Sequence, residues 1–271
     1  MKLDELSRRL RGVGVEQADL EALVLAEFVT GLTRAKLLAG DFKLRPTQAG
    51  RLRQLIRRRG RQPLAYLLKR KEFYGRNFYV DRRVLIPRPE SEDLVEAALG
   101  LGTGFGRLYD VGCGSGCLAI SYLKTRAGKP PGVQLLDASR QALRVARKNC
   151  RRHSIGRVTF SLQDVSALPA GYFAPGSLIL ANLPYLDITE RGAYERGSPM
   201  LRSEPAASLY AGGGGLELYG SLLKACAGQD LTLVCESLPP QRAALEKLAA
   251  AGGFRPNGRR GLATVFSPLT K

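Results

Sequence analysis

The chain has 271 residues, of which 44% are hydrophobic and 24% charged, and its formal net charge is +18. This length can bury one large domain and a smaller one. No run of about 18 apolar residues predicts a membrane-spanning helix, and the charged first ten residues lack the apolar core of a secretory signal. We therefore expect a cytoplasmic protein without a membrane anchor. The positive charge favours a polyanionic environment of RNA, DNA or the ribosome, and a lineage-wide bias towards arginine is the alternative.

Metal and thiol chemistry find little support in the sequence. The five cysteines are scattered and odd in number. Cys113 and Cys117 lie four residues apart, but no second cysteine pair or histidine accompanies them, so we expect no metal site. The single histidine, His153, follows two arginines. That setting is typical of a solvated surface and not of a catalytic triad.

The first 72 residues predict a small helical bundle. Apolar residues recur at three- and four-residue spacings, as at Leu6 and Leu10 and at Leu52, Leu55 and Ile56. This is the period of a helix with one buried face. Basic residues outnumber acidic ones here, which favours an anionic partner, and a solvated helix face is the alternative.

Residues 73–90 differ in character from the predicted helices before them. Aromatic and β-branched residues around Gly75 predict a short β-hairpin that links the two halves of the chain. Two prolines, Pro87 and Pro89, hold the following segment extended. We expect Ser91 to cap a helix over residues 92–99.

A glycine-rich turn follows the first predicted strand, residues 108–111. The turn consists of Gly112, Cys113, Gly114, Ser115 and Gly116 and leads into a predicted helix. Its glycines let the backbone pass close to a ligand, and N–H groups at the helix start can bind one. The spacing differs from the G-x-G-x-x-G of dinucleotide-binding proteins, and no proton relay is evident. An NAD-dependent dehydrogenase is therefore the least favoured class.

The next two predicted strands are followed by acidic residues. Asp137 ends the strand that begins at residue 132, about 20 residues beyond the glycine turn, where a carboxylate can accept hydrogen bonds from both hydroxyls of a ribose. Its alternative role is that of a helix N-cap. Asp164 and Val165 follow the strand 158–162, where we expect an adenine ring. Together with the turn, these residues resemble the S-adenosylmethionine site of Rossmann-like methyltransferases.

The fourth predicted strand, residues 178–181, runs into Asn182, Leu183, Pro184 and Tyr185. The Asn182 side chain and the backbone carbonyls of Leu183 and Pro184 are hydrogen-bond acceptors, and Tyr185 offers a flat aromatic face. Such a set can hold both N–H bonds of a planar –C–NH2 group while the ring packs on its plane. The motif resembles the Asn-Pro-Pro-Tyr of amino-methyltransferases, and an ordinary exit from a strand is the alternative.

The alternation of strands and helices predicts an α/β fold with a parallel sheet. A glycine loop is expected at 212–215, and it is either a connector or a substrate lid. After it we expect a strand at 231–236, a helix at 241–252, and a terminal strand pair at 253–255 and 263–266. With the resemblance above, the expected fold is a Rossmann-like class I S-adenosylmethionine-dependent methyltransferase. It has a mostly parallel seven-stranded sheet and a small N-terminal helical domain.

Over nearly its whole length the chain resembles the HemK/PrmC family, which methylates the glutamine of the Gly-Gly-Gln tip in class 1 peptide-chain release factors. The resemblance is carried by residues 85–92, 110–116 and 182–185, and by Glu204-Pro205 with the glycine loop after it. It implies S-adenosylmethionine as methyl donor, S-adenosylhomocysteine as product, and a release factor as partner, with the ribosome or RNA nearby. We expect a monomer with three parts. Residues 1–72 recognise the substrate, 73–90 form a linker, and 91–271 carry the methyltransferase domain.

The same resemblance assigns roles to individual residues. The cofactor-binding residues are Gly112, Cys113, Gly114, Ser115, Gly116, Asp137, Asp164, Val165 and Asn182. The catalytic residues, which also hold the glutamine, are Asn182, Leu183, Pro184 and Tyr185. The chain departs from the family pattern at four places: Leu183 replaces a proline, Gly214 stands where an Asp is usual, Leu238 replaces a glycine, and an acidic residue near Gly258 is absent.

Two other functions stay open at this point. An N-methyltransferase acting on exocyclic amino groups of DNA or RNA bases would use the same motif to clamp a flipped base. A non-catalytic module would bind the release factor or the ribosome through the basic helical domain.

Overall fold

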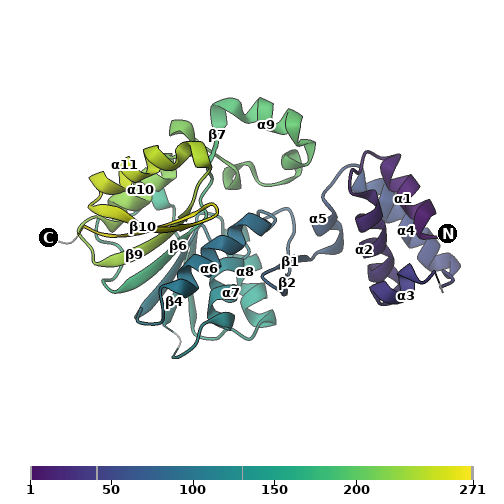
Figure 1. Cartoon of the computed structure of the whole chain (residues 1–271), viewed down its shortest axis with the longest axis horizontal. Coiled ribbons are helices and arrows are strands. Elements are labelled where there is room, and N and C mark those ends of the chain that lie inside the picture. Colours follow the sequence, from purple (N-terminus) through teal and green to yellow (C-terminus); the bar gives the residue numbers. More distant parts are fainter. Residues whose placement is uncertain (1, 41, 130, 270–271) are drawn as a thin grey trace. The chain divides into compact units, whose positions relative to one another are not determined.

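The computed structural model describes residues 2–40, 42–129 and 131–269, and the chain divides into two compact units, Met1–Arg70 and Lys71–Lys271 (Figure 1). The first unit contains α1 (Leu3–Arg11), α2 (Ala18–Thr30), α3 (Arg34–Leu38), α4 (Pro46–Arg59) and α5 (Leu64–Leu68). Its core is built from fully buried leucines of four helices, among them Leu6, Leu25, Leu37 and Leu52. The predicted helical bundle is therefore confirmed. None of the helices in the described ranges has both the length and the hydrophobicity that a membrane crossing requires.

The second unit opens with a hairpin of β1 (Lys71–Phe73) and β2 (Arg76–Phe78). Tyr74 and Gly75 both have positive φ, 51° and 66°, as the tightest hairpin turns require. The rest of the segment to Pro87 forms no strand. It is held instead by Asn149, whose Nδ2 donates to the carbonyl of Tyr79 and whose Oδ1 accepts from its N–H, at 2.9 and 2.8 Å.

The large sheet of this unit has seven strands in the order β10-β11-β9-β6-β3-β4-β5. The parallel strands are β3 (Arg107–Val111), β4 (Gly132–Asp137), β5 (Val158–Leu162), β6 (Ser177–Ala181) and β9 (Leu231–Glu236), and the antiparallel ones are β10 (Phe254–Arg260) and β11 (Ala263–Pro268). Every residue of the central strand β6 is buried, which is typical of a sheet covered on both faces. The prediction of a mostly parallel seven-stranded sheet is confirmed.

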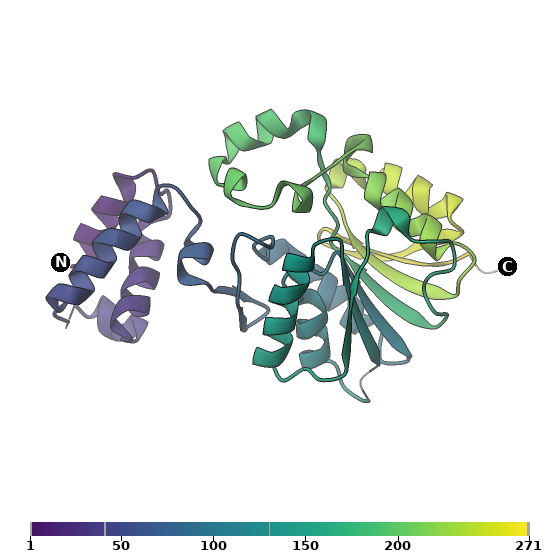
Figure 2. The same cartoon turned by 180° about the vertical axis from the view of Figure 1, so that it is seen from behind.

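Helices cover both faces of this sheet (Figures 1 and 2). One face is covered by α6 (Glu92–Gly100), α7 (Cys117–Thr125) and α8 (Arg140–Arg152), and the other by α10 (Glu217–Cys226) and α11 (Arg242–Ala251). Each face has its own apolar core. Leu118 and Leu143 pack into one of them, and Leu222 and Leu245 into the other.

Between β6 and α10 the chain makes a long excursion that stands away from the sheet in both views (Figures 1 and 2). It contains the short parallel pair β7 (Leu186–Asp187) and β8 (Tyr210–Ala211), the helix α9 (Arg191–Gly197), and the 3-10 turns η3 (Ile188–Glu190), η4 (Pro199–Ser203) and η5 (Ala206–Ser208). The remaining 3-10 turns are η1 (Pro89–Ser91), η2 (Val165–Ala167), η6 (Gly213–Gly215) and η7 (Pro239–Gln241). The glycine loop thus forms a defined turn ahead of α10.

Candidate active site

The two motifs singled out in the sequence leave the sheet side by side. Strands β3 and β6 are parallel neighbours, with Val111 opposite Ala181, so the glycine turn and the Asn182 motif follow from the same edge. They are also in contact, because a β-carbon built on Gly112 would lie 2.9 Å from Cδ2 of Leu183. Gly112 has a φ of +69°, so conformation and space both require glycine there.

The side chain of Asp137 is bound to the backbone of the glycine turn. Its Oδ2 accepts from the N–H of Gly114 at 2.9 Å, and its Oδ1 accepts from the N–H of Ser139 at 2.8 Å. The pKa of Asp137 is raised above its ordinary value because the side chain is buried, although these two hydrogen bonds oppose the rise. The N-cap of α8 is Ser139, whose Oγ accepts from Ala142. The alternative role of Asp137 as the helix cap is therefore wrong.

One cavity joins most of the candidate residues. Of these residues its lining includes Gly112, Gly114, Asp137, Asp164, Val165, Asn182, Leu183 and Pro184, and the wall is completed by Leu85, Val111, Ala138, Gln163, Ala207, Ser208 and Leu218. Asp164 also accepts from the N–H and hydroxyl of Ser166, at 2.9 and 2.7 Å. The candidate cofactor and substrate residues thus share a space at the carboxyl ends of β3, β4 and β6, where ligands of open α/β sheets bind.

Four candidate residues do not line this cavity. Cys113 and Ser115 are buried inside the turn. The backbone carbonyl of Ser115 accepts a hydrogen bond from Nδ2 of Asn149 at 2.9 Å. A β-carbon on Gly116 would face the core at 3.3 Å from Leu135. Tyr185 lines a neighbouring cavity that also includes Arg88 and shares Asn182, Leu183 and Pro184 with the first. Cys113, Ser115 and Gly116 therefore shape the glycine turn from within and do not face the cavity.

Asn182 keeps one acceptor atom unused. Its Nδ2 donates to Oγ of Ser91 at 2.8 Å, which explains why Ser91, at the start of α6, makes no capping hydrogen bond. Ser91 is the N-cap residue of α6, as predicted, but its hydroxyl binds Asn182 and makes no capping hydrogen bond. The Oδ1 of Asn182 is buried and has no hydrogen-bond partner among the described residues. A buried acceptor without a partner is costly, and a donor from a ligand would satisfy it.

Residues far along the chain fix the turn of the motif. Tyr219, fully buried in α10, accepts from the N–H of Leu183 at 3.2 Å and lies within hydrogen-bond distance of the Glu236 carbonyl. Tyr185 donates to Oε1 of Glu236, and Gln241 donates from Nε2 to the carbonyls of Tyr185 and Gly214, at 2.6 and 2.8 Å. Tyr219, Glu236 and Gln241 belong to none of the motifs that the sequence singles out. The position of Glu236 does carry a signal in the sequence, because an acidic residue that ends an apolar parallel strand is typical of a ligand site.

The proline-rich segment and Glu204 are also linked. The carboxylate of Glu204 is buried, and it accepts from the N–H of Ile86 at 2.9 Å and from Nη2 of Arg88 at 2.5 Å. Glu204 therefore ties the Glu204-Pro205 segment to residues 85–92, of which Leu85 and Arg88 line the neighbouring cavity. Leu183, the departure from a proline, is 3% exposed and packs in the core, so the sheet accommodates it. Within the described residues, no group of His, Cys, Asp and Glu side chains is placed to hold a metal ion.

Comparison with known proteins agrees with this geometry. Residues 2–68 match the family described as PrmC N-terminal domain, and residues 106–183 match a methyltransferase domain family. The release factor glutamine methyltransferase of Moorella thermoacetica is 38% identical over 234 residues, which are 83% of this chain and 79% of that protein. The one from Neisseria gonorrhoeae is 34% identical over 243 residues, 87% and 86% of the two chains. Among solved structures, the catalytic domain of hMettl16 in complex with the MAT2A 3'UTR hairpin 1 superposes with a TM-score of 0.51 at 15% identity, covering 86% of this chain and 85% of that one.

The fold and the site define a class I S-adenosylmethionine-dependent methyltransferase. The glycine turn with positive φ and the carboxylate at the end of β4 fit the cofactor of this class. The identities to curated relatives go further. The chain belongs to the release factor glutamine methyltransferase family, which confirms the resemblance drawn from the sequence.

Proposed function

We propose that this protein transfers a methyl group from S-adenosylmethionine to the side-chain amide nitrogen of the glutamine in the Gly-Gly-Gln motif of a peptide-chain release factor in the cytoplasm. The observation that carries the proposal is the unused acceptor Oδ1 of Asn182, which lies in the motif that lines the same cavity as the glycine turn. A primary amide offers two N–H donors for such an acceptor and a backbone carbonyl beside it.

The cofactor residues are assigned by their place in this cavity. Gly112 and Gly114 leave room for a ligand close to the backbone, and Asp137 is the acceptor for ribose hydroxyls. Asp164 and Val165 line the part where the adenine is expected. When bound, S-adenosylmethionine supplies an electrophilic methyl group on its sulfonium. Cys113, Ser115 and Gly116 contribute by holding the shape of the turn.

The substrate residues orient a poor nucleophile. An amide nitrogen has a delocalised lone pair, so its reactivity depends on how it is held. Acceptors from Asn182 and the backbone of Leu183 or Pro184 would take both N–H bonds, which favours the positive charge that develops on nitrogen. They also fix the direction of the lone pair, so alignment supplies much of the rate. Tyr185, anchored by Glu236, packs against the amide plane.

The match of residues 2–68 to the PrmC N-terminal domain supports a substrate-binding role for the helical unit. Residues 1–72 recognise the release factor, residues 73–90 connect, and residues 91–271 carry out the transfer. In this proposal the enzyme acts as a monomer. The two other functions considered, a nucleic-acid base methyltransferase and a non-catalytic module, are not favoured by the named relatives.

The test is mass spectrometry of a purified release factor treated with enzyme and S-adenosylmethionine. The expected result is a gain of one CH2 mass on the peptide that contains Gly-Gly-Gln, located on the glutamine by fragmentation. The matched control is the same release factor with that glutamine changed to alanine, which should gain nothing. Methyl groups found on added RNA or DNA, and none on the release factor, would overturn the proposal.

A further inference from the structure

Helix α8 carries an unusual set of charges. Its 13 residues include six basic side chains and no acidic one. Four of them, Arg140, Arg144, Arg147 and Arg151, are spaced by four, three and four residues and are all exposed. Residues at these spacings share one face of a helix. We call these four side chains the arginine stripe. The opposite face of α8 is buried against the sheet.

The arginine stripe has no neutralising partner. Within residues 2–40, 42–129 and 131–269, none of its four side chains forms an ion pair with a carboxylate. Some exposed arginines elsewhere in the protein do form such pairs, as in Arg9–Glu5 and Arg191–Glu195. Like charges three and four residues apart weaken a helix. An anionic partner would offset this repulsion along the whole stripe.

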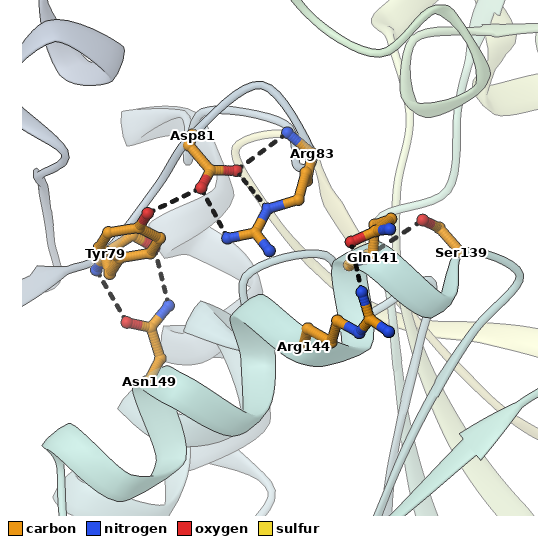
Figure 3. Close-up of polar contacts among 8 residues, drawn as sticks. Tyr79, Asp81, Arg83, Ser139, Gln141, Arg144 and Asn149 are labelled. Carbon is orange, nitrogen blue, oxygen red and sulfur yellow. Dashed lines mark hydrogen bonds and ion pairs between the residues drawn. The ribbon is translucent and has the colours of Figure 1, made fainter.

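The carboxylate of Asp81, drawn near α8 in Figure 3, already has hydrogen-bond partners. Figure 3 shows Tyr79, Asp81 and Arg83 bound to one another, with Asn149 reaching from α8 to the backbone of Tyr79. Asp81 accepts from Nε of Arg83 at 2.8 Å and from the hydroxyl of Tyr79 at 2.8 Å. Arg144 lies on the same helix as Asn149, beside Gln141 and apart from Tyr79, Asp81 and Arg83 (Figure 3). Asp81 therefore does not neutralise the arginine stripe.

A groove with an aromatic wall runs beside the stripe. Arg140, Arg144 and Arg147 line it together with Leu143 of α8 and two residues of the edge strand β5, Phe160 and Leu162. The guanidinium of Arg147 lies 4.7 Å from the centroid of the Phe160 ring, and Leu162 is 46% exposed. Cations in a row next to a partly buried aromatic side chain and an exposed leucine form a surface suited to the phosphates of a single strand.

We propose that the arginine stripe and the Phe160 groove bind single-stranded RNA. The guanidinium forks match phosphate oxygens in pairs, and the stripe is about 16 Å long at 1.5 Å per residue, enough for several successive phosphates. The Phe160 ring holds the guanidinium of Arg147 beside the groove through a cation–π contact. A lipid surface fits less well, because the apolar side of α8 is already buried in the core and cannot enter a membrane interface. The choice of RNA over DNA rests on the proposed function, whose substrate is a protein of translation.

The experiment measures fluorescence anisotropy of a fluorescein-labelled oligouridylate of about 12 nucleotides with the full chain, over a range of salt concentrations. The test variant is R144Q/R147Q/R151Q, which leaves Arg140 beside the Asp137 loop intact. The matched control is R53Q/R57Q/R58Q on α4, where three exposed arginines are removed for the same change in net charge. Circular dichroism melts verify that both variants fold.

The wild type and the α4 control should bind alike, and the α8 variant should bind roughly tenfold or more weakly, with a salt slope shallower by about 2. A third variant, Phe160→Leu, should weaken binding several-fold because Arg147 loses the ring that positions its guanidinium, and the salt slope should stay unchanged because no charge is removed. Binding that falls equally in both triple variants would attribute the effect to total charge and overturn the proposal. No RNA binding by the wild type, or binding only to acidic vesicles or polyglutamate, would also overturn it.

Methylation of the free release factor separates this inference from the proposed function. The α8 variant should methylate the release factor at the wild-type rate while its RNA binding is lost. A variant that loses both would indicate that the arginine stripe binds the release factor itself, which contradicts an RNA site. A wild-type enzyme that binds RNA through the stripe but methylates no release factor would leave the stripe standing and refute the proposed function.

Discussion

The hydroxyl of Tyr185 donates a hydrogen bond to Oε1 of Glu236, 3.0 Å away at the end of β9. Glu236 is fully buried. Burial raises its pKa above the ordinary value, and hydrogen bonds from Ser91 and Tyr185 oppose this rise. Burial and the nearby carboxylate raise the pKa of Tyr185, so its hydroxyl stays protonated and remains a donor. The last residue of the Asn-Leu-Pro-Tyr motif is thereby held by a second strand of the sheet.

This anchoring predicts different effects for two substitutions at one position. Tyr185→Ala should lower kcat/KM for the release factor roughly ten- to hundredfold, because a displaced substrate loses alignment, and should leave the affinity for S-adenosylmethionine unchanged. Tyr185→Phe keeps the ring but removes the hydrogen bond to Glu236, so its loss of activity should be measurable and smaller than that of Tyr185→Ala. Steady-state kinetics and calorimetric cofactor titration measure both. Loss of cofactor affinity with unchanged substrate KM would refute the substrate role of Tyr185.

The unused acceptor of Asn182 should matter more than its donor. Asn182→Ala should reduce methyl transfer by about 10²-fold or more, in the range found for removing one preorganised polar partner. Ser91→Ala is the matched control, because it removes the partner of Nδ2 at 2.8 Å and leaves Oδ1 in place, so its effect should be below about tenfold. A radiolabelled-methyl assay compares the two variants. Equal losses would show that the acceptor has no special part.

Two adjacent glycines provide a test of the contact between η6 and the motif. A β-carbon on Gly215 would lie 2.0 Å from the carbonyl oxygen of Tyr185, whereas one on Gly214 would meet nothing within 4 Å. Both have positive φ, +82° and +67°, so both alanine variants carry a similar backbone penalty of about 1–2 kcal/mol. Gly215→Ala should be clearly less stable and much less active than Gly214→Ala. Denaturant unfolding and turnover measure this, and equal behaviour of the two variants would contradict the predicted clash.

The buried Asp110 predicts a pH dependence of stability. Burial raises its pKa from 3.8 to about 7, the charge of Asp137 adds to this, and the N–H of Ala119 opposes it. Because the folded pKa is raised, the stabilisation from this group is complete below about pH 4 and is lost as the pH rises through about 7. The total change is on the order of 4 kcal/mol. Urea unfolding of wild type and Asp110→Asn across this range should show a stability difference that falls with pH, and a constant difference would contradict the prediction.

Much of the methyltransferase fold could be predicted because its signals are local. The apolar run of β6, the glycines with positive φ after β3 and the acid at the end of β4 each identify their own element. Parallel strands then place these ends at one edge. The adjacency of Gly112 and Leu183 follows from that rule once β3 and β6 are neighbours.

The contacts that hold the site could not be predicted, because they join residues far apart in the chain. Asn182 and Ser91 are 91 positions apart, and Ile86 and Glu204 are 118 positions apart. The neighbours of Ser91 predict its N-cap position correctly, but no local pattern indicates that its hydroxyl binds Asn182. The strands β7 and β8 have two residues each, too few to show a period.

The link from Gln241 to the carbonyl of Tyr185 has a consequence for biosynthesis. Glu236 and Gln241 emerge after nearly nine-tenths of the chain, and both hold the turn that presents Asn182. A nascent polypeptide that has already paired β3, β4 and β6 still lacks the hydrogen bonds that join Glu236 and Gln241 to Tyr185. The enzyme therefore becomes competent only when β9 and the turn after it have joined the strands that precede them.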